Sequence, residues 1–164
     1  MHNSIAIVSG SDARYFGILM DLMNSLRENA SGVVFDFCLY DIGLTPEQRR
    51  QVEPHCHAIF DLDWCIDFPE RDKVPGHHRL RVCRPFMPKH FSGHDIYIWL
   101  DADLWVQDAT VLDIFARAAG RGKLAIAAEY DRAYKQAYKR GKLFGWTHNH
   151  KHYRLGFGWR VADR

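Results

Sequence analysis

The chain has 164 residues, of which 47% are hydrophobic and 26% charged, and its formal net charge is +2. This length and composition predict a globular domain with a sizeable core and exclude a disordered chain. The apolar stretch at residues 5–8 is too short for a signal-peptide core, and no run is long enough to span a membrane, so we expect a cytoplasmic protein. The four cysteines include no Cys-x-x-Cys pair and are expected to be reduced thiols.

The N-terminal part predicts a strand, a polar turn and a helix. Residues 4–9 (Ser-Ile-Ala-Ile-Val-Ser) have an apolar centre typical of a buried strand, and residues 10–12 have turn chemistry. From residue 13 to 29, apolar side chains recur at three- and four-residue steps, which predicts a helix with Asp12 as its N-cap. Its N-terminus should point at the carboxyl end of the strand, where helix starts attract phosphates.

The next stretch predicts further alternation of strands and helices. Residues 33–40 are expected to form a second strand, and Thr45 should cap a short helix that has proline at its first position. Residues 58–62 predict a third short strand. A loop is expected over residues 63–78, and residues 79–91 should be helical in part because two prolines interrupt them.

The last predicted elements are a strand at residues 96–100, a helix at residues 110–119 that ends at Gly120, and a strand at residues 123–128. Strands and helices thus alternate along the chain. This order predicts an α/β fold with a mainly parallel sheet and helices on both faces.

Two aspartates, Asp101 and Asp103, directly follow the strand predicted at residues 96–100. In extended chain, side chains two residues apart project to the same side, so these carboxylates should converge while Ala102 points away. Carboxylates this close repel each other unless a proton or a cation lies between them. We therefore predict a site for a hard divalent ion, with phosphate oxygens as further ligands. The alternative is a pair of solvated aspartates at a strand-to-loop turn.

Three stretches together resemble a known family. They are residues 5–15 (Ile-Ala-Ile-Val-Ser-Gly-Ser-Asp-Ala-Arg-Tyr), residues 41–44 (Asp-Ile-Gly-Leu) and residues 99–103 (Trp-Leu-Asp-Ala-Asp). They resemble nucleotide-sugar glycosyltransferases of the GT-A fold with an Asp-x-Asp motif, in the glycogenin-like and bacterial galactosyltransferase-like group (family 8 type). The resemblance covers residues 4–131. It implies a Rossmann-like sheet, a UDP-sugar donor, retention of anomeric configuration, and an acceptor (glycan, lipid or protein) that these motifs do not identify.

The resemblance also implies which residues bind the nucleoside. It assigns the base and ribose to Ser9, Ser11, Asp12 and Tyr15. The Tyr15 ring would lie against the uracil. The backbone of Ala102 would lie near the ribose.

For the diphosphate and the sugar, the resemblance implies a metal ion and a basic residue. Asp101 and Asp103 would hold Mn²⁺ or Mg²⁺. Arg84, with Arg81 as its rival, matches a basic residue that contacts the diphosphate or the sugar. Glu129 lies where the group often has an acid near the donor sugar or the acceptor.

Histidines invite two further metal assignments. The group usually has a further metal ligand, a histidine, in its second half, and His148, His150 and His152 could supply it; a solvated polar loop is the alternative we favour. The run His-Cys-His at residues 55–57, together with Cys65, matches no standard zinc spacing. Surface histidines beside a buried thiol are expected there instead.

The domain organisation predicted is a nucleotide-sugar-binding domain at residues 1–131 and a basic, aromatic-rich segment at residues 132–164. That segment has nine Lys or Arg residues and one acidic residue. Because the family pattern stops near residue 131, we expect a donor-binding half with little transferase activity of its own. Its uncovered apolar faces should favour self-association or a partner chain.

Two rival functions remain open from the sequence. An apolar strand followed by Asp-x-Asp also opens the haloacid-dehalogenase-like phosphotransferases, but these carry the motif on an early strand, and Trp105 stands where they usually have Thr or Val. The basic aromatic segment could instead make the chain a nucleic-acid or anion-binding module. We do not expect nucleic acid as the partner, because that composition is unspecific.

Overall fold

A computed structural model describes residues 4–122 and 124–127 of the chain. The chain divides into two compact units, Met1–Ile66 with Val74–Ala125, and Asp67–Lys73 with Ile126–Arg164. All the strands and α-helices given below belong to the first unit. No helix in the described part of the chain is long and apolar enough to cross a membrane.

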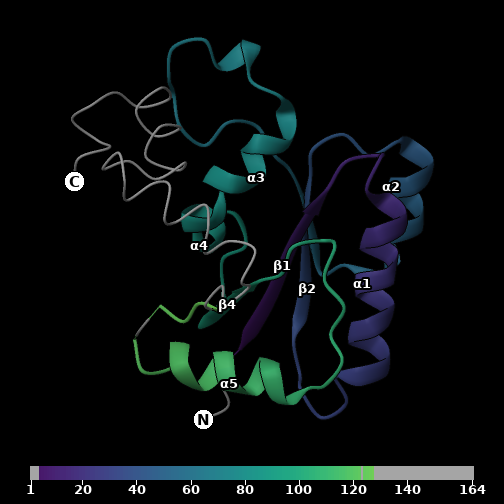
Figure 1. Ribbon diagram of the computed structural model, residues 1–164, viewed down its shortest axis with the longest axis vertical. Helices are drawn as coiled ribbons and strands as arrows, with labels where there is room; N and C mark the ends of the chain where they lie inside the picture. The colour runs from purple at the N-terminus through teal and green to yellow at the C-terminus, as the bar shows by residue number, and fades with distance from the viewer. Residues whose placement is uncertain (1–3, 123, 128–164) are drawn as a thin grey trace, which may run out of the picture. The chain divides into compact units, whose positions relative to one another are not determined.

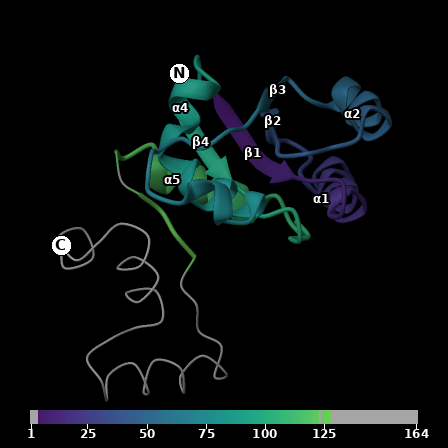
Figure 2. The ribbon, with the colours of Figure 1, turned by 90° about the horizontal axis from the view of Figure 1, so that it is seen from above.

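The first unit is built on four parallel strands: β1 (Ile5–Ser11), β2 (Asp36–Asp41), β3 (Ala58–Asp61) and β4 (Ile96–Trp99). Their order in the sheet is β3, β2, β1, β4, as Figure 2 shows. Every residue of β1 after Ile5 is buried, because helices or loops cover both faces of this central strand. The predicted α/β fold with a parallel sheet is confirmed.

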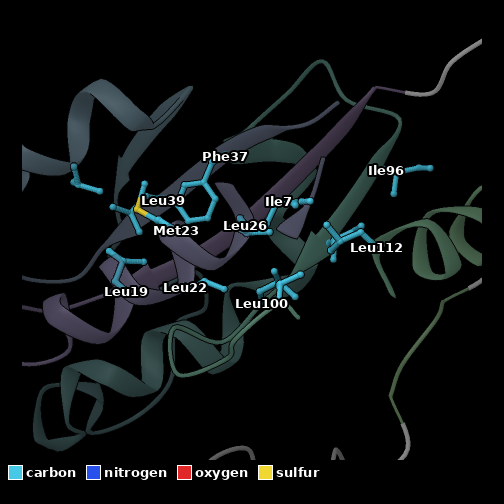
Figure 3. Close-up of a cluster of buried hydrophobic side chains, with 14 residues drawn as sticks. Ile7, Leu19, Leu22, Met23, Leu26, Phe37, Leu39, Ile96, Leu100 and Leu112 are labelled. Atoms are coloured by element: carbon cyan, nitrogen blue, oxygen red, sulfur yellow. The ribbon is translucent and has the colours of Figure 1, made fainter. Parts of the chain in front are cut away.

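One face of the sheet is covered by α1 (Phe16–Asn29) and α5 (Thr110–Ala119). The apolar stripe of α1 packs on β1 and β2, and Leu112 of α5 joins the same cluster near β4. Figure 3 shows part of this cluster, in which side chains from α1 and from the strands meet. Its fully buried members include Ile7, Leu19, Leu22, Leu39 and Leu112.

The other face is covered by a chain of short helical turns: α3 (Arg79–Val82), a 3-10 turn (Arg84–Phe86) and α4 (Met87–His90). Figure 1 shows α3 and α4 on the side of β1 and β2 opposite to α1. Residues 79–91 were expected to be helical in part, and prolines at the starts of the second and third turns explain the interruptions. The buried members of this second cluster include Val8, Tyr40, Cys83 and Phe91.

Helix α2 (Pro46–Val52) begins where the sequence predicts it. The hydroxyl of Thr45 accepts the backbone N–H of Gln48 at 3.2 Å, and the Gln48 side-chain oxygen accepts the N–H of Thr45 at 3.0 Å. This reciprocal pair satisfies two amides that the first helical turn leaves without partners. The Gln48 amide group also donates to the Ala13 carbonyl at 3.1 Å and so joins α2 to the turn after β1.

Two sequence expectations about element boundaries are corrected. The N-cap of α1 is Tyr15 and not Asp12, because the Asp12 carboxylate accepts the amides of Arg14 and Tyr15 and forms an extra turn before the helix. β2 begins at Asp36, opposite Ala6, and not at residue 33. In this register residue 34 falls opposite Ser4, before the first residue of β1, and Val34 is 89% exposed.

The strand predicted at residues 123–128 is also not observed in the part of it that the structure describes. Residues 124–127 have no regular secondary structure, and residues 123 and 128 lie outside the described part of the chain. Leu124 and Ile126 are 88% and 77% exposed. An apolar run predicts a strand only if a neighbouring strand can pair with it, and none does so among the described residues.

At the carboxyl ends of β2 and β3, one arginine joins two aspartates. Asp41 is 8% exposed and accepts an Arg49 N–H at 2.7 Å and the backbone N–H groups of Gly43 and Leu44, each at 2.8 Å. Arg49 also pairs with Asp61, whose side chain is 77% exposed. Because Asp41 has lost most of its hydration, its three charge-assisted hydrogen bonds should contribute more to stability than the exposed pair does.

This difference predicts unequal effects of removing the two aspartates. Asp41→Ala should lower the free energy of unfolding by about 2 to 3 kcal/mol, because two backbone amides lose their partner and the partly buried guanidinium of Arg49 loses one of its two. Asp61→Ala, the matched control, should cost less than about 1 kcal/mol because that pair is solvated. Urea titrations of both variants would measure this, and equal costs would contradict the role given to Asp41.

Candidate functional site

The polar turns of the unit gather at one edge of the sheet. Because the strands are parallel, the turns after β1, β2, β3 and β4 all leave from the carboxyl edge. Val8 lies opposite Trp99 in the register, and the Leu100 N–H donates to the Val8 carbonyl at 3.0 Å. The two residues before Asp101 are thus fixed to the centre of β1, and Asp101 comes directly after them at the carboxyl edge.

The aspartate pair lies in a turn and not in extended chain. β4 ends at Trp99, and the Leu104 N–H donates to the Asp101 carbonyl at 3.1 Å, which closes a turn around Ala102 and Asp103. Asp101 and Asp103 are both exposed, and Ala102 is partly buried against the core. The alternation expected for extended chain therefore does not apply here, although the pair does follow the strand at its carboxyl end.

A cation and an indole hold Asp101 in place. One oxygen of its carboxylate, Oδ1, accepts an Arg84 N–H at 2.8 Å and the Trp99 indole N–H at 2.7 Å. The guanidinium of Arg84 also lies over the Trp99 ring, 4.8 Å from its centroid, in a cation–π contact. Among the described residues it is Arg84, and not Arg81, that pairs with the motif.

Arg84 reaches the motif because its segment lies close against β1. Gly10 allows this approach: a Cβ at that position would lie 2.3 Å from Cδ2 of Leu80 in α3. Any larger residue would force Leu80 to move. Gly10 of β1 thus leaves room for α3, and for the 3-10 turn that carries Arg84, to lie close to this strand.

The loop after the motif is anchored to α1 through Val106, which is 5% exposed. Its N–H donates to the Ser25 hydroxyl at 3.0 Å, and its carbonyl accepts the Asn29 side-chain N–H at 3.0 Å. Ser25 is fully buried and donates in turn to the Leu22 carbonyl at 2.7 Å. Both backbone polar groups of Val106 are therefore satisfied by α1 side chains, which fixes where the motif loop returns to the core.

The four residues expected around the base and ribose have different exposures. Ser9 is fully buried, and its hydroxyl has no hydrogen-bond partner among the described residues. Ser11 is 1% exposed and donates to the Asp12 carbonyl. Asp12 is partly buried, whereas Tyr15 is 48% exposed at the start of α1. Tyr15 therefore does not fill the core, and Ser9 and Ser11 do not present their hydroxyls to solvent.

The turns after β1 and β2 are joined by their backbones. The Ala13 N–H donates to the Gly43 carbonyl at 3.0 Å, and the Ile42 N–H donates to the Ser11 carbonyl at 3.1 Å. Gly43 has a φ of +131°, a conformation that favours glycine. A pocket of about 550 Å³ opens beside these turns, lined in part by Asp41, Gly43, Arg49, Asp63 and Arg79.

The oxygen ligands of the motif suit a hard cation. Mg²⁺ and similar ions are commonly held by one or two carboxylates and by phosphate oxygens, and Asp101 and Asp103 supply the carboxylates. In the described part of the chain, no third His, Cys or acidic side chain joins them in a three-ligand group. Glu129, His148, His150 and His152 lie outside the described residues.

Residues 55–57 do not form a zinc site with cysteine ligands among the described residues. All four cysteines are free, and burial raises the pKa of the Cys56 thiol to about 12. His57 instead lies beside Asp36 and His94, and these three are the one group with metal-ligand spacing among the described residues. They lie at the amino ends of the strands, away from the motif.

Sequence reasoning assigned Trp99 to the motif strand and missed its contact with Asp101. A signal was present, since Trp99 stands only two residues before Asp101, near enough in the chain for its indole N–H to reach that carboxylate. Nothing in the sequence indicates that His94 meets Asp36, because the two are far apart in the chain.

Comparison with known proteins gives matches to solved structures only. No protein-family model and no curated protein matches the chain. A crystal structure of the galactosyltransferase LgtC with donor and acceptor sugar analogues matches with a TM-score of 0.48 and 20% identity, covering 65% of this chain and 41% of that one. An active-site mutant of LgtC matches with a TM-score of 0.49 and 18% identity, covering 67% and 41%. At these identities and TM-scores the likeness does not establish a function.

The anchoring of the motif loop can be tested at Ser25. Ser25→Ala should leave the buried N–H of Val106 without a partner and cost about 1 to 3 kcal/mol of stability. Amide hydrogen exchange at residues 104–107 should also become faster. Ser31→Ala, a change of the same kind at an exposed position, should alter neither measurement. Unchanged exchange in Ser25→Ala would show that the loop does not depend on this contact.

Proposed function

We propose that this chain binds the donor substrate of a metal-dependent glycosyl transfer, a UDP-sugar, at the carboxyl edge of its sheet. The observation that carries the proposal is the Asp-x-Asp turn at the end of β4, with Arg84 paired to its first aspartate. Carboxylates for a metal ion and a cation for phosphate thus lie side by side, next to the turn that ends β1. A nucleoside diphosphate needs both kinds of group.

Asp101 and Asp103 are the residues that would hold the ion, Mn²⁺ or Mg²⁺. When bound, such an ion offsets the negative charge that develops on the departing nucleoside diphosphate. The carboxylates attract that ion, because they keep a negative potential at an exposed position where a cation can enter. The second oxygen of Asp101 has no partner among the described residues and is available to a ligand.

Arg84 can pair either with Asp101 or with the diphosphate of the donor. In the free chain its charge offsets that of Asp101, and the Trp99 ring supports its guanidinium from one side. Arg84 is 43% exposed, so it can turn from Asp101 toward a diphosphate without breaking a buried contact. Its planar guanidinium suits two phosphate oxygens at once. Arg84 would therefore hold the leaving group while the carboxylates are engaged with the cation.

The nucleoside end of the donor would lie over the turn after β1. Tyr15 offers an exposed ring at the N-terminus of α1, where backbone N–H groups also favour anions. Ser9 and Ser11 are buried, so their contribution is to shape the turn, while backbone groups and Asp12 would meet the ribose. The Ala102 backbone lies in the neighbouring turn, close enough in sequence to the carboxylates to contact the same ligand.

The reaction that such a donor undergoes is sugar transfer. The bond between the anomeric carbon and the diphosphate oxygen breaks, and an oxygen of the acceptor forms the new bond. The acceptor is a glycan, a lipid or a protein whose identity this site does not define. The chain spans about two fifths of the length of the LgtC structures it resembles, so transfer by this chain is proposed together with elements that complete the acceptor side.

The rival functions have less support. The haloacid-dehalogenase-like enzymes carry their motif on an early strand, whereas the motif strand here is the fourth in the chain. The basic segment that would bind nucleic acid lies outside the described residues. Nothing in the described part of the chain favours that function.

Metal-dependent donor binding is the first test. UDP and UDP-sugars should bind more tightly with Mn²⁺ than with EDTA in calorimetric titrations, and Asp103→Asn should remove the metal-dependent part. Asp21→Asn, a matched change at an exposed position of α1, should leave it intact. Equal affinity with Mn²⁺ and with EDTA would contradict the proposed site.

The role of Tyr15 gives a separate prediction. Tyr15→Ala should weaken nucleotide binding by about 1 to 3 kcal/mol, because stacking on the base is lost. Tyr15→Phe keeps the ring and should bind nearly as well as the parent chain. Since Tyr15 is half exposed, both variants should melt close to the parent temperature. A large drop in melting temperature with unchanged binding would instead make this residue structural.

A further inference from the structure

The amino edge of the sheet carries a group of side chains that the donor site does not use. Asp36 is the first residue of β2, His57 directly precedes β3, and His94 lies two residues before β4. One ligand atom from each, a carboxylate oxygen and two imidazole nitrogens, all lie within 4.8 Å of one another. Three segments that are distant in sequence thus converge, on the edge opposite to Asp101 and Asp103.

The spacing suits a small tetrahedral ion. His94 Nε2 lies 2.9 Å from one oxygen of Asp36, and His57 Nδ1 lies 3.4 Å from the other. Two ligands held about 2.0 to 2.1 Å from a tetrahedral zinc ion lie about 3.4 Å apart. The side chains therefore need only small movements to surround an ion.

The contact of His94 Nδ1 shows that Nε2 is the ring nitrogen free to bind an ion. His94 Nδ1 lies 3.3 Å from the Phe91 carbonyl, which can only accept, so the proton of the neutral ring belongs on Nδ1. Nε2 then presents a lone pair to the carboxylate of Asp36. Two acceptors at 2.9 Å repel each other unless a second proton or a cation lies between them.

The surroundings hold His94 in this orientation. Its side chain is 5% exposed, and the Phe91 carbonyl that receives its N–H also accepts the Tyr97 hydroxyl at 2.8 Å. Gly93, which directly precedes His94, has a φ of +100°, a backbone conformation that favours glycine. A histidine that donates its other N–H to a backbone carbonyl is the usual arrangement of a metal ligand.

Access to the site comes from the other two residues. The side chains of Asp36 and His57 are 45% and 55% exposed, so an ion can enter from solvent. His57 is placed by its backbone, whose N–H donates to the Phe37 carbonyl at 2.7 Å. Three protein ligands leave one position of a tetrahedral ion for water.

We propose that Asp36, His57 and His94 form a binding site for a divalent transition-metal ion, zinc foremost, at the amino edge of the sheet. Two imidazole nitrogens favour zinc and its neighbours over Mg²⁺ or Ca²⁺, which prefer oxygen ligands. The ion joins the starts of β2 and β3 to the turn before β4. This site is independent of the proposed donor site in ligands and in preferred metal.

Calorimetric titration of the full chain with Zn²⁺ tests the site. The chain has other histidines, so the readout is the difference between the parent and His57→Gln, which should lose one tight equivalent. Losing even an outer partner of a metal-bound histidine commonly costs about 10- to 100-fold in affinity, and we expect the loss of a ligand to cost at least as much. Asp36→Asn should behave in the same way, and Mg²⁺ should not compete.

Two controls separate this site from others. His55→Gln changes an exposed histidine next to the site and should keep the full Zn²⁺ stoichiometry. Asp103→Asn should also keep the full Zn²⁺ stoichiometry, even where it abolishes metal-dependent UDP binding.

Co²⁺ gives a spectroscopic test of the same site. It should produce the visible absorption band of a nitrogen- and oxygen-ligated ion in the parent chain and not in His57→Gln. If His57→Gln and Asp36→Asn bind Zn²⁺ with the parent affinity and stoichiometry, a proton and not a metal joins Asp36 to His94, and the proposal is wrong.

Discussion

The central position of β1 is the constraint on which the rest of the structure depends. This strand pairs in parallel with β2 on one side and with β4 on the other, and it is buried on both faces. Parallel pairing sends every following turn to the same edge of the sheet. The turn after β1 and the Asp-x-Asp turn therefore become neighbours although about 90 residues separate them, as the register of Val8 with Trp99 requires.

Much of the fold could be predicted from the sequence, because its signals are local. Buried strands appear as short apolar runs, Thr45 and Pro46 mark a helix start, and α5 matches its predicted bounds. Boundaries that depend on partners could not be predicted. Residue 34 falls before the first residue of β1 in the register, and the Asp12 carboxylate accepts the amides of Arg14 and Tyr15 in an extra turn before α1. Likewise, the pairing of Arg84 with Asp101 and Trp99 needs the packing of α3 against Gly10, which no sequence pattern reports.

The two edges of the sheet present different chemistry. At the carboxyl edge, exposed carboxylates lie beside a guanidinium, which suits a hard cation and the phosphates of a nucleotide sugar. At the amino edge, two imidazoles and one carboxylate converge, which suits a softer ion held by the protein alone. If both sites are filled as proposed, the first metal arrives with the substrate, and the second ties together strand starts that β1 and β2 already hold in place.

A crystal structure of the chain with UDP and Mn²⁺, with anomalous data that locate the manganese, tests the central claim most directly. The account predicts one manganese peak within coordination distance, about 2.0 to 2.6 Å, of carboxylate oxygens from both Asp101 and Asp103 and of diphosphate oxygens. Arg84 should have left Asp101 for the diphosphate, and the base should lie against Tyr15. Manganese found elsewhere, or UDP bound away from the carboxyl edge of β1 and β4, would contradict it.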